Sequence, residues 1–105
     1  MSKNYELDVY PEAKVNIKEI AIYISETLNS PQAAINLLES IDNAFSILEQ
    51  FPQAGTIIEK RHKGVYEYRR YVVKGYDYNI YYIFYKDIVS IVSIMHQSRS
   101  TDNLK

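Results

Sequence analysis

Two different hydrophobic periods divide the chain near residue 55. Before that point, apolar side chains recur every three or four residues, as on one face of an amphipathic helix. The spacing predicts one helix over Glu12–Leu28 and a second that starts at Pro31 and is ended by Phe51-Pro52. The two apolar stripes consist of Ile17, Ile20, Ala21, Ile24 and Leu28, and of Ala34, Leu37, Leu38, Ile41, Phe45 and Leu48.

The segments that flank these helices carry start and stop signals. In Asn29-Ser30-Pro31, the serine hydroxyl can accept a hydrogen bond from a free N–H group of the second helix, and proline is tolerated in the first helical turn. So short a link predicts an antiparallel helix pair. Ahead of the first helix, Tyr5–Tyr10 alternates apolar and polar side chains, which is the period of a half-buried strand.

Beyond residue 64 the chain has the composition of strands. Eight of the eleven tyrosines lie between Tyr66 and Tyr85, and β-branched and aromatic residues continue to Met95. The basic stretch Gly55–Gly64 is interpreted as an exposed connection. The predicted strands are Tyr66–Val73, Asn79–Tyr85 and Ile88–His96.

The resulting order, β-α-α-β-β-β, predicts an α+β fold. An antiparallel helix pair is expected to pack on a mainly antiparallel, four-stranded sheet. The first strand is expected to insert beside a later one, since a single strand is not stable alone. A chain of 105 residues is long enough for one hydrophobic core, so we expect a single domain over residues 1–105.

Composition narrows the class of protein. Apolar residues make up 47% of the chain and charged residues 24%, as in ordinary soluble globular proteins. The absence of cysteine excludes thiolate catalysis and cysteine-ligated zinc, and His62 and His96 make a poor metal site, so neither a metal nor another cofactor is expected. No apolar run has the length of a membrane span or a signal peptide, and we expect a cytoplasmic protein without membrane contact.

Charge is divided unevenly between the two halves. Residues 1–54 carry three lysines against eight acidic residues, whereas residues 55–105 carry nine basic residues against five acidic ones. One interpretation is that an anionic partner meets the C-terminal half. The other is that the two helices merely have solvated acidic faces.

The candidate functional residues are cations and aromatic rings of the C-terminal half. On a regular strand, Arg69 and Arg70 point to opposite faces, so at least one of them is expected to be an ordinary solvated or ion-paired side chain. His96 ends the last predicted strand, and Arg99 follows it. The alternatives are that the imidazole bonds to backbone and that the guanidinium pairs with Asp102 or caps the sheet edge. Further binding candidates are Lys60, Arg61 and Lys63 in the basic stretch, and Tyr68 and Tyr78, whose rings could stack on an unpaired base.

The ordered set of segments resembles the RelE/ParE superfamily of bacterial toxins. It comprises the strand YRRYVV, the hairpin YNIYYIFYKDIVSIVSI and the ending HQSRSTDNL. In ParE-like and plasmid-stabilisation sequences, the last strand commonly ends in a histidine, followed by arginine, an acidic residue and leucine. The matching residues are His96, Arg99, Asp102 and Leu104.

The resemblance implies two possible activities and one kind of partner. RelE-like members are ribonucleases that cut messenger RNA in the ribosomal A site, whereas ParE-like members poison DNA gyrase. Both are neutralised by a small antitoxin, which implies a toxin–antitoxin hetero-oligomer beside a possible homodimer. In a nuclease, His96 would act as general acid or base, and Arg99 with Arg69 or Arg70 would hold the phosphate.

Departures from the nuclease pattern favour the ParE-like activity. RelE-like nucleases usually have an arginine near the start of the penultimate strand, where this chain has Asn79. They also tend to have alternating lysines on the preceding strand, where this chain reads Arg70-Tyr71-Val72, and the Arg-Tyr-His-Tyr ending of another nuclease branch is missing. A third possibility is a degenerate toxin that retains only antitoxin binding, through the apolar helix faces or an open sheet edge.

Overall fold

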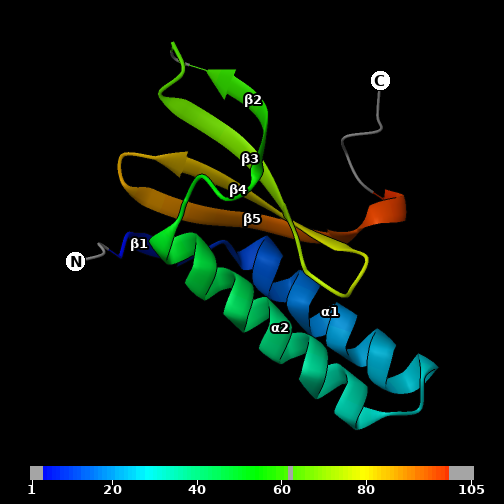
Figure 1. Ribbon diagram of the computed structural model, residues 1–105. Coiled ribbons are helices and arrows are strands. Elements are labelled where there is room, and N and C mark those ends of the chain that lie inside the picture. Colours follow the sequence, from blue (N-terminus) through cyan, green and yellow to red (C-terminus); the bar gives the residue numbers. More distant parts are fainter. Residues whose placement is uncertain (1–3, 62, 100–105) are drawn as a thin grey trace.

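The computed structural model, which describes residues 4–61 and 63–99, has two layers. Helices α1 and α2 lie side by side and antiparallel on one face of a twisted sheet (Figure 1). In chain order the elements are β1 (Glu6–Val9), α1 (Pro11–Thr27), α2 (Pro31–Gln50), β2 (Thr56–Arg61), β3 (Tyr66–Val72), β4 (Tyr78–Tyr85), β5 (Ile88–His96) and the 3-10 helix η1 (Gln97–Arg99).

The helix pair forms where the periodicity predicts it. Pro11 and Pro31 occupy first-turn positions, and the Ser30 hydroxyl accepts a hydrogen bond of 3.2 Å from the N–H of Ala33. The predicted cap is therefore confirmed. Asn29 completes the short link in a left-handed conformation, with φ of 50°. Within the residues described, no helix is both long and apolar enough to cross a membrane.

The sheet has the strand order β1-β5-β4-β3-β2. β1 pairs in parallel with β5, so that Glu6 lies opposite Ile88 and Val9 opposite Ile91. All other neighbours are antiparallel. The α+β class and the insertion of the first strand beside a later one are thus both confirmed.

The sheet has five strands rather than the expected four. The stretch Gly55–Gly64, interpreted as a connection, contains the edge strand β2, which pairs with β3 from Thr56 opposite Arg70 to Arg61 opposite Tyr66. All six β2 side chains are exposed, so no alternation of burial marks the strand. Its only local signal is the β-branched run at Thr56, and backbone pairing with β3 decides its structure.

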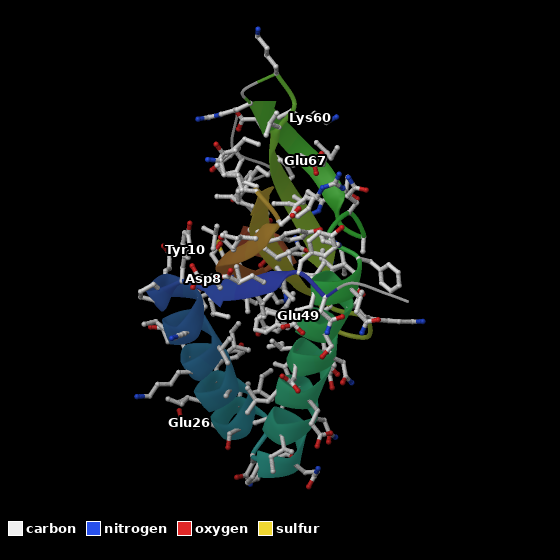
Figure 2. All side chains as sticks on the ribbon, turned by 90° about the vertical axis from the view of Figure 1, so that its left-hand side faces the viewer. Asp8, Tyr10, Glu26, Glu49, Lys60 and Glu67 are labelled. Atoms are coloured by element: carbon white, nitrogen blue, oxygen red, sulfur yellow. The ribbon has the colours of Figure 1, made fainter. Side chains whose placement is uncertain are left out.

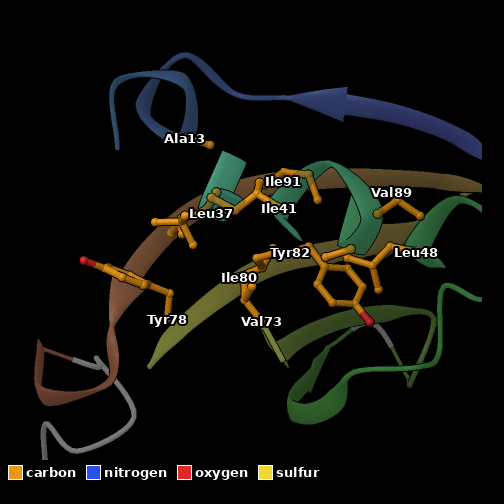
Figure 3. Packing of buried hydrophobic residues seen from close by; sticks show 12 residues of the cluster. Ala13, Leu37, Ile41, Leu48, Val73, Tyr78, Ile80, Tyr82, Val89 and Ile91 are labelled. Carbon is orange, nitrogen blue, oxygen red and sulfur yellow. The ribbon is translucent and has the colours of Figure 1, made fainter. Parts of the chain in front are cut away.

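The core lies between α2, α1 and the helix-facing side of β4 and β5. Residues that face each other across antiparallel strands share one side of the sheet, so Ile80 with Ile94 and Tyr82 with Ile91 point toward the helices. Figure 3 shows this cluster, with Tyr78 at one end and Val89 and Leu48 at the other. The buried members are Ala13, Leu37, Ile41, Ala44, Leu48, Val73, Tyr78, Ile80, Tyr82, Val89, Ile91 and Ile94.

Candidate functional site

Strand β3 places Arg69 and Arg70 on opposite faces of the sheet. Arg69 lies opposite Tyr82, a core residue, and therefore on the helix-covered face. Arg70 lies opposite Tyr81 and therefore on the open face. The two guanidinium groups cannot act together on one phosphate from these positions.

Arg69 is a buried structural cation. Its side chain forms an ion pair with Glu67, with 2.8 Å between Nε and Oε1, and the side chains are only 7% and 12% exposed. Its Nη1 group also donates to the backbone carbonyls of Gln53 and Gly55. The expectation that one of the two β3 arginines is ion-paired is thus confirmed, and the guanidinium holds the α2–β2 connection against the sheet.

Tyr82 fastens the same connection. Its hydroxyl donates to the carbonyl of Pro52 at 2.7 Å and accepts from the N–H of Gly55 at 2.9 Å. Burial raises the pKa of Tyr82 from 10.0 to about 12. Glu67, Arg69 and Tyr82 together form the Arg69 cluster. Sequence patterns did not indicate it, because most of its partners are backbone groups.

We expect this burial to make the protein less stable at alkaline pH. The folded state holds the Tyr82 proton more tightly than the unfolded chain does, so the stability linked to this proton is complete below pH 10 and is lost as the pH rises through about 12. Urea unfolding between about pH 9 and pH 12 would measure the decline. The Tyr82→Phe variant should decline less over this range, and an identical slope for both proteins would contradict the assignment.

His96 ends β5 on the helix-covered face. It lies opposite Tyr78, and the two rings meet edge to face with centroids 5.3 Å apart. Its Nδ1 lies 3.2 Å from the N–H of Ser98 and 2.9 Å from the Ser98 hydroxyl. The turn of η1 therefore fixes the ring, as in the alternative in which the imidazole bonds to backbone. Nε2 has no partner among the side chains and backbone groups that the structure describes.

His96 lies at the edge of a groove of about 760 Å³, here called the α1–β5 groove. The groove lies between α1, the β3–β4 connection and the end of β5. Its lining, as far as the chain is described, includes no lysine or arginine. The lining residues are Asn16, Glu19, Ile20, Tyr23, Ile24, Gly75, Tyr76, Asp77, Tyr78, Ile94, Met95, His96 and Ser98.

The imidazole and the Arg69 cluster lie far apart. His96 is opposite Tyr78, whereas Arg69 is opposite Tyr82, four residues further along β4. At about 3.3 Å per residue, this separates them by roughly 13 Å along the strand. The side chain of Arg99, and all of His62 and Asp102, lie outside what the structure describes. Among the described residues, no phosphate-binding cation accompanies His96.

The open face of the sheet carries a second group of candidates. Tyr68 stacks on Tyr81, with centroids 6.2 Å apart and an angle of 25°. The amide of Asn79 donates to the Tyr81 hydroxyl at 3.3 Å, and its own oxygen is buried without a partner in the described structure. Tyr78 lies on the other face and is only 8% exposed, so its ring forms part of the core rather than a surface for stacking.

The basic candidates extend away from the helices. Figure 2 shows Lys60 at the end of the molecule opposite to Glu26 of α1. Lys60, Arg61 and Lys63 are all exposed. Arg61 pairs with Glu59 at 2.6 Å, and this hydrogen bond raises the pKa of Arg61. Three of the basic residues of the C-terminal half thus lie together in the exposed β2–β3 hairpin.

Comparison with known protein families shows to which family the chain belongs. A family model described as the ParE toxin of the type II toxin-antitoxin system, parDE, matches residues 7–101. The chain belongs to the ParE toxin family. This confirms the resemblance to the RelE/ParE superfamily, and the match includes both His96 and Arg99.

Solved structures of toxin–antitoxin systems share this ParE-family fold. The chain is similar to one in the chromosomal ParDE system of P. aeruginosa, with a TM-score of 0.72, 14% identity and coverage of 88% of this chain and 95% of that one. It is also similar to one in the RelBE2 toxin–antitoxin complex of Mycobacterium tuberculosis, with a TM-score of 0.54, 18% identity and coverage of 90% and 92%. No curated protein sequence matches the chain.

Proposed function

We propose that this toxin of a type II toxin–antitoxin system inhibits growth by acting on DNA gyrase, and that a cognate antitoxin neutralises it. The observation that carries the proposal is the separation of His96 from the described cations. Cleavage of RNA needs an acid–base group and cations that meet at one phosphate. Arg69 is occupied by Glu67 and two carbonyls, and Arg70 lies on the other face of the sheet.

Asn79 gives independent support. It stands where RelE-like nucleases usually have an arginine, and its side chain is 3% exposed and bonded to Tyr81. A buried neutral amide supplies no positive charge to a phosphate transition state. The loss of one such stabilising group typically costs about 3–4 kcal/mol of transition-state stabilisation.

A gyrase-binding toxin requires an exposed surface rather than a catalytic constellation. The β2–β3 hairpin offers one, since it extends away from the helices (Figure 1) and carries the exposed side chains of Lys60, Arg61 and Lys63. Such charges increase the rate of association with an anionic partner. Gyrase acts in the cytoplasm, where we also place this protein, with a toxin–antitoxin complex as its resting form.

The test compares two cellular targets with one set of variants. Purified protein is expected to inhibit DNA supercoiling by gyrase, and its controlled expression should induce the DNA damage response with messenger RNA left intact. His96→Ala should retain this inhibition. The Lys60→Glu/Lys63→Glu variant is expected to weaken it, because the exposed positive surface is reversed.

Two other results would replace the proposal. Cuts in messenger RNA at defined codons that vanish in His96→Ala and Arg99→Ala would establish the nuclease. Unaffected growth with well-folded protein, together with tight binding to a cognate antitoxin, would establish a degenerate toxin that only binds its antitoxin.

A further inference from the structure

The α1–β5 groove has an apolar floor and an acidic rim. Ile20 and Ile24 of α1 face Ile94 and the ring of Tyr78 across it, whereas Glu19 and Asp77 lie at its exposed edge. Neither carboxylate forms an ion pair or a hydrogen bond within the part of the chain that the structure describes. Two solvated negative charges therefore stand beside an apolar surface with no positive side chain of the described lining to balance them.

The two carboxylates of the groove determine which charge a ligand can carry. Nucleic acids and anionic lipid surfaces are repelled by Glu19 and Asp77. A metal ion is a poor fit, because no group of three or more histidine or acidic residues is close enough to hold one among residues 4–61 and 63–99. A cation on an apolar stem fits, since the stem covers the floor while the charge meets the carboxylates. The rings of Tyr23 and Tyr76, which also line the groove, add favourable cation–π surface.

The length and volume of the groove match those of a short segment of protein. Its α1 wall runs from Asn16 to Ile24. Eight residues of helix at 1.5 Å each give about 12 Å, which matches about four residues of extended chain or two turns of helix. The groove volume of about 760 Å³ accommodates two or three side chains of such a segment.

We propose that the α1–β5 groove binds a partner protein through a short segment in which an apolar side chain lies next to an arginine or lysine. The apolar side chain packs against Ile20, Ile24 and Ile94, and the basic group pairs with Glu19 and Asp77. Asp77 is preorganised for this role, because its backbone carbonyl accepts the N–H of Gln97 at 2.8 Å and ties the β3–β4 connection to η1. This proposal does not depend on gyrase as the target.

The position of His96 gives it a role in recognition. In the tautomer in which Nδ1 accepts the N–H of Ser98, the ring carries an N–H group at Nε2. That N–H group is available to donate to a backbone carbonyl of the bound segment. His96 therefore contributes to binding through this N–H group, and His96→Ala should lower the affinity for the peptide.

Selection from a random peptide library on the full chain tests the proposal. Enriched peptides are expected to carry an arginine or lysine next to a leucine, isoleucine or phenylalanine, and to shift the NMR signals of Ile20, Asp77 and Ile94. The Glu19→Gln/Asp77→Asn variant should bind the same peptides at least tenfold more weakly. The matched control is Glu39→Gln/Asp42→Asn on α2, which removes the same charge outside the groove and should leave the affinity unchanged.

Each contrary outcome overturns the proposal. The proposal is wrong if no peptides are enriched or if the enriched peptides lack a basic residue. It is also wrong if both double variants lose affinity equally, or if the NMR shifts are confined to other surfaces. All four substitutions are at exposed positions, and thermal unfolding verifies that the variants are folded. The measurement involves neither gyrase nor growth, so its failure is distinguishable from failure of the proposed function.

Discussion

Replacement of Arg69 by methionine is expected to lower the free energy of unfolding by about 3–5 kcal/mol, the usual cost of leaving one partner of a buried ion pair alone. The variant leaves the Glu67 carboxylate, whose side chain is 12% exposed, without its cation. It also removes the donor to the carbonyls of Gln53 and Gly55. Urea unfolding followed by circular dichroism measures the loss.

Two further variants isolate the buried pair. Glu67→Gln combined with Arg69→Met should recover part of the loss, because no buried charge is then left unpaired. Arg61→Ala breaks the pair with Glu59, whose side chains are 64% and 47% exposed, and should have a much smaller effect on stability than Arg69→Met. If Arg69→Met lowers the free energy of unfolding no more than Arg61→Ala does, the Arg69 guanidinium does not stabilise the fold. The argument against a nuclease, which treats Arg69 as a structural cation, would then be weaker.

Substitution of Gly55 by alanine is expected to cost about 2–4 kcal/mol, from overpacking and a weakened hydrogen bond together. An added Cβ would lie 2.6 Å from the Tyr82 hydroxyl oxygen and 2.7 Å from the backbone oxygen of Arg70. The Arg70 oxygen belongs to a sheet strand, so the α2–β2 connection must move away and the Gly55 N–H must leave Tyr82.

Gly75→Ala is the matched control for this effect. Gly75 has φ of +85° but no atom within 4 Å of an added Cβ, so its cost is confined to backbone strain of about 1–2 kcal/mol. Chemical denaturation of both variants gives the comparison. If Gly55→Ala is the milder of the two substitutions, the close approach to Tyr82 is not present in solution.

Most of the fold could be predicted from the sequence, because local signals and burial agree there. The helix expected over Glu12–Leu28 is α1, Pro11–Thr27, and the one expected from Pro31 is α2, Pro31–Gln50. The apolar stripe marks the face that packs, and Ser30 with Pro31 marks the boundary. The last strand, Ile88–His96, begins and ends where its composition predicts.

The edge strand and the Arg69 cluster could not be predicted for a different reason. β2 buries none of its side chains, so pairing with β3 leaves no hydrophobic signature. Arg69 and Arg70 are adjacent and identical in type, and only the topology decides which one faces the helices. Tyr68 and Tyr78 were equivalent candidates by composition, yet the structure places one on the open face and the other in the core.

The surroundings of His96 depend on residues that lie far apart along the chain. The position of His96 at the end of the apolar strand follows from the sequence, but the groove beside it is formed by α1 and the β3–β4 connection, which lie far away along the chain. The joint action of His96 and Arg99 stays a prediction, since the Arg99 side chain lies outside the described part. The acidic rim of Glu19 and Asp77 has no motif, because tertiary packing alone brings these two residues together.

The pairing of β1 with β5 has a consequence for synthesis of the toxin. Glu6 lies opposite Ile88, so the sheet cannot be completed until nearly the whole chain has left the ribosome. Nascent chains and prematurely terminated fragments therefore lack the finished sheet and the groove at its end. The folded toxin therefore forms only after translation has passed the last strand. An antitoxin that is already present can bind each new molecule as soon as it folds.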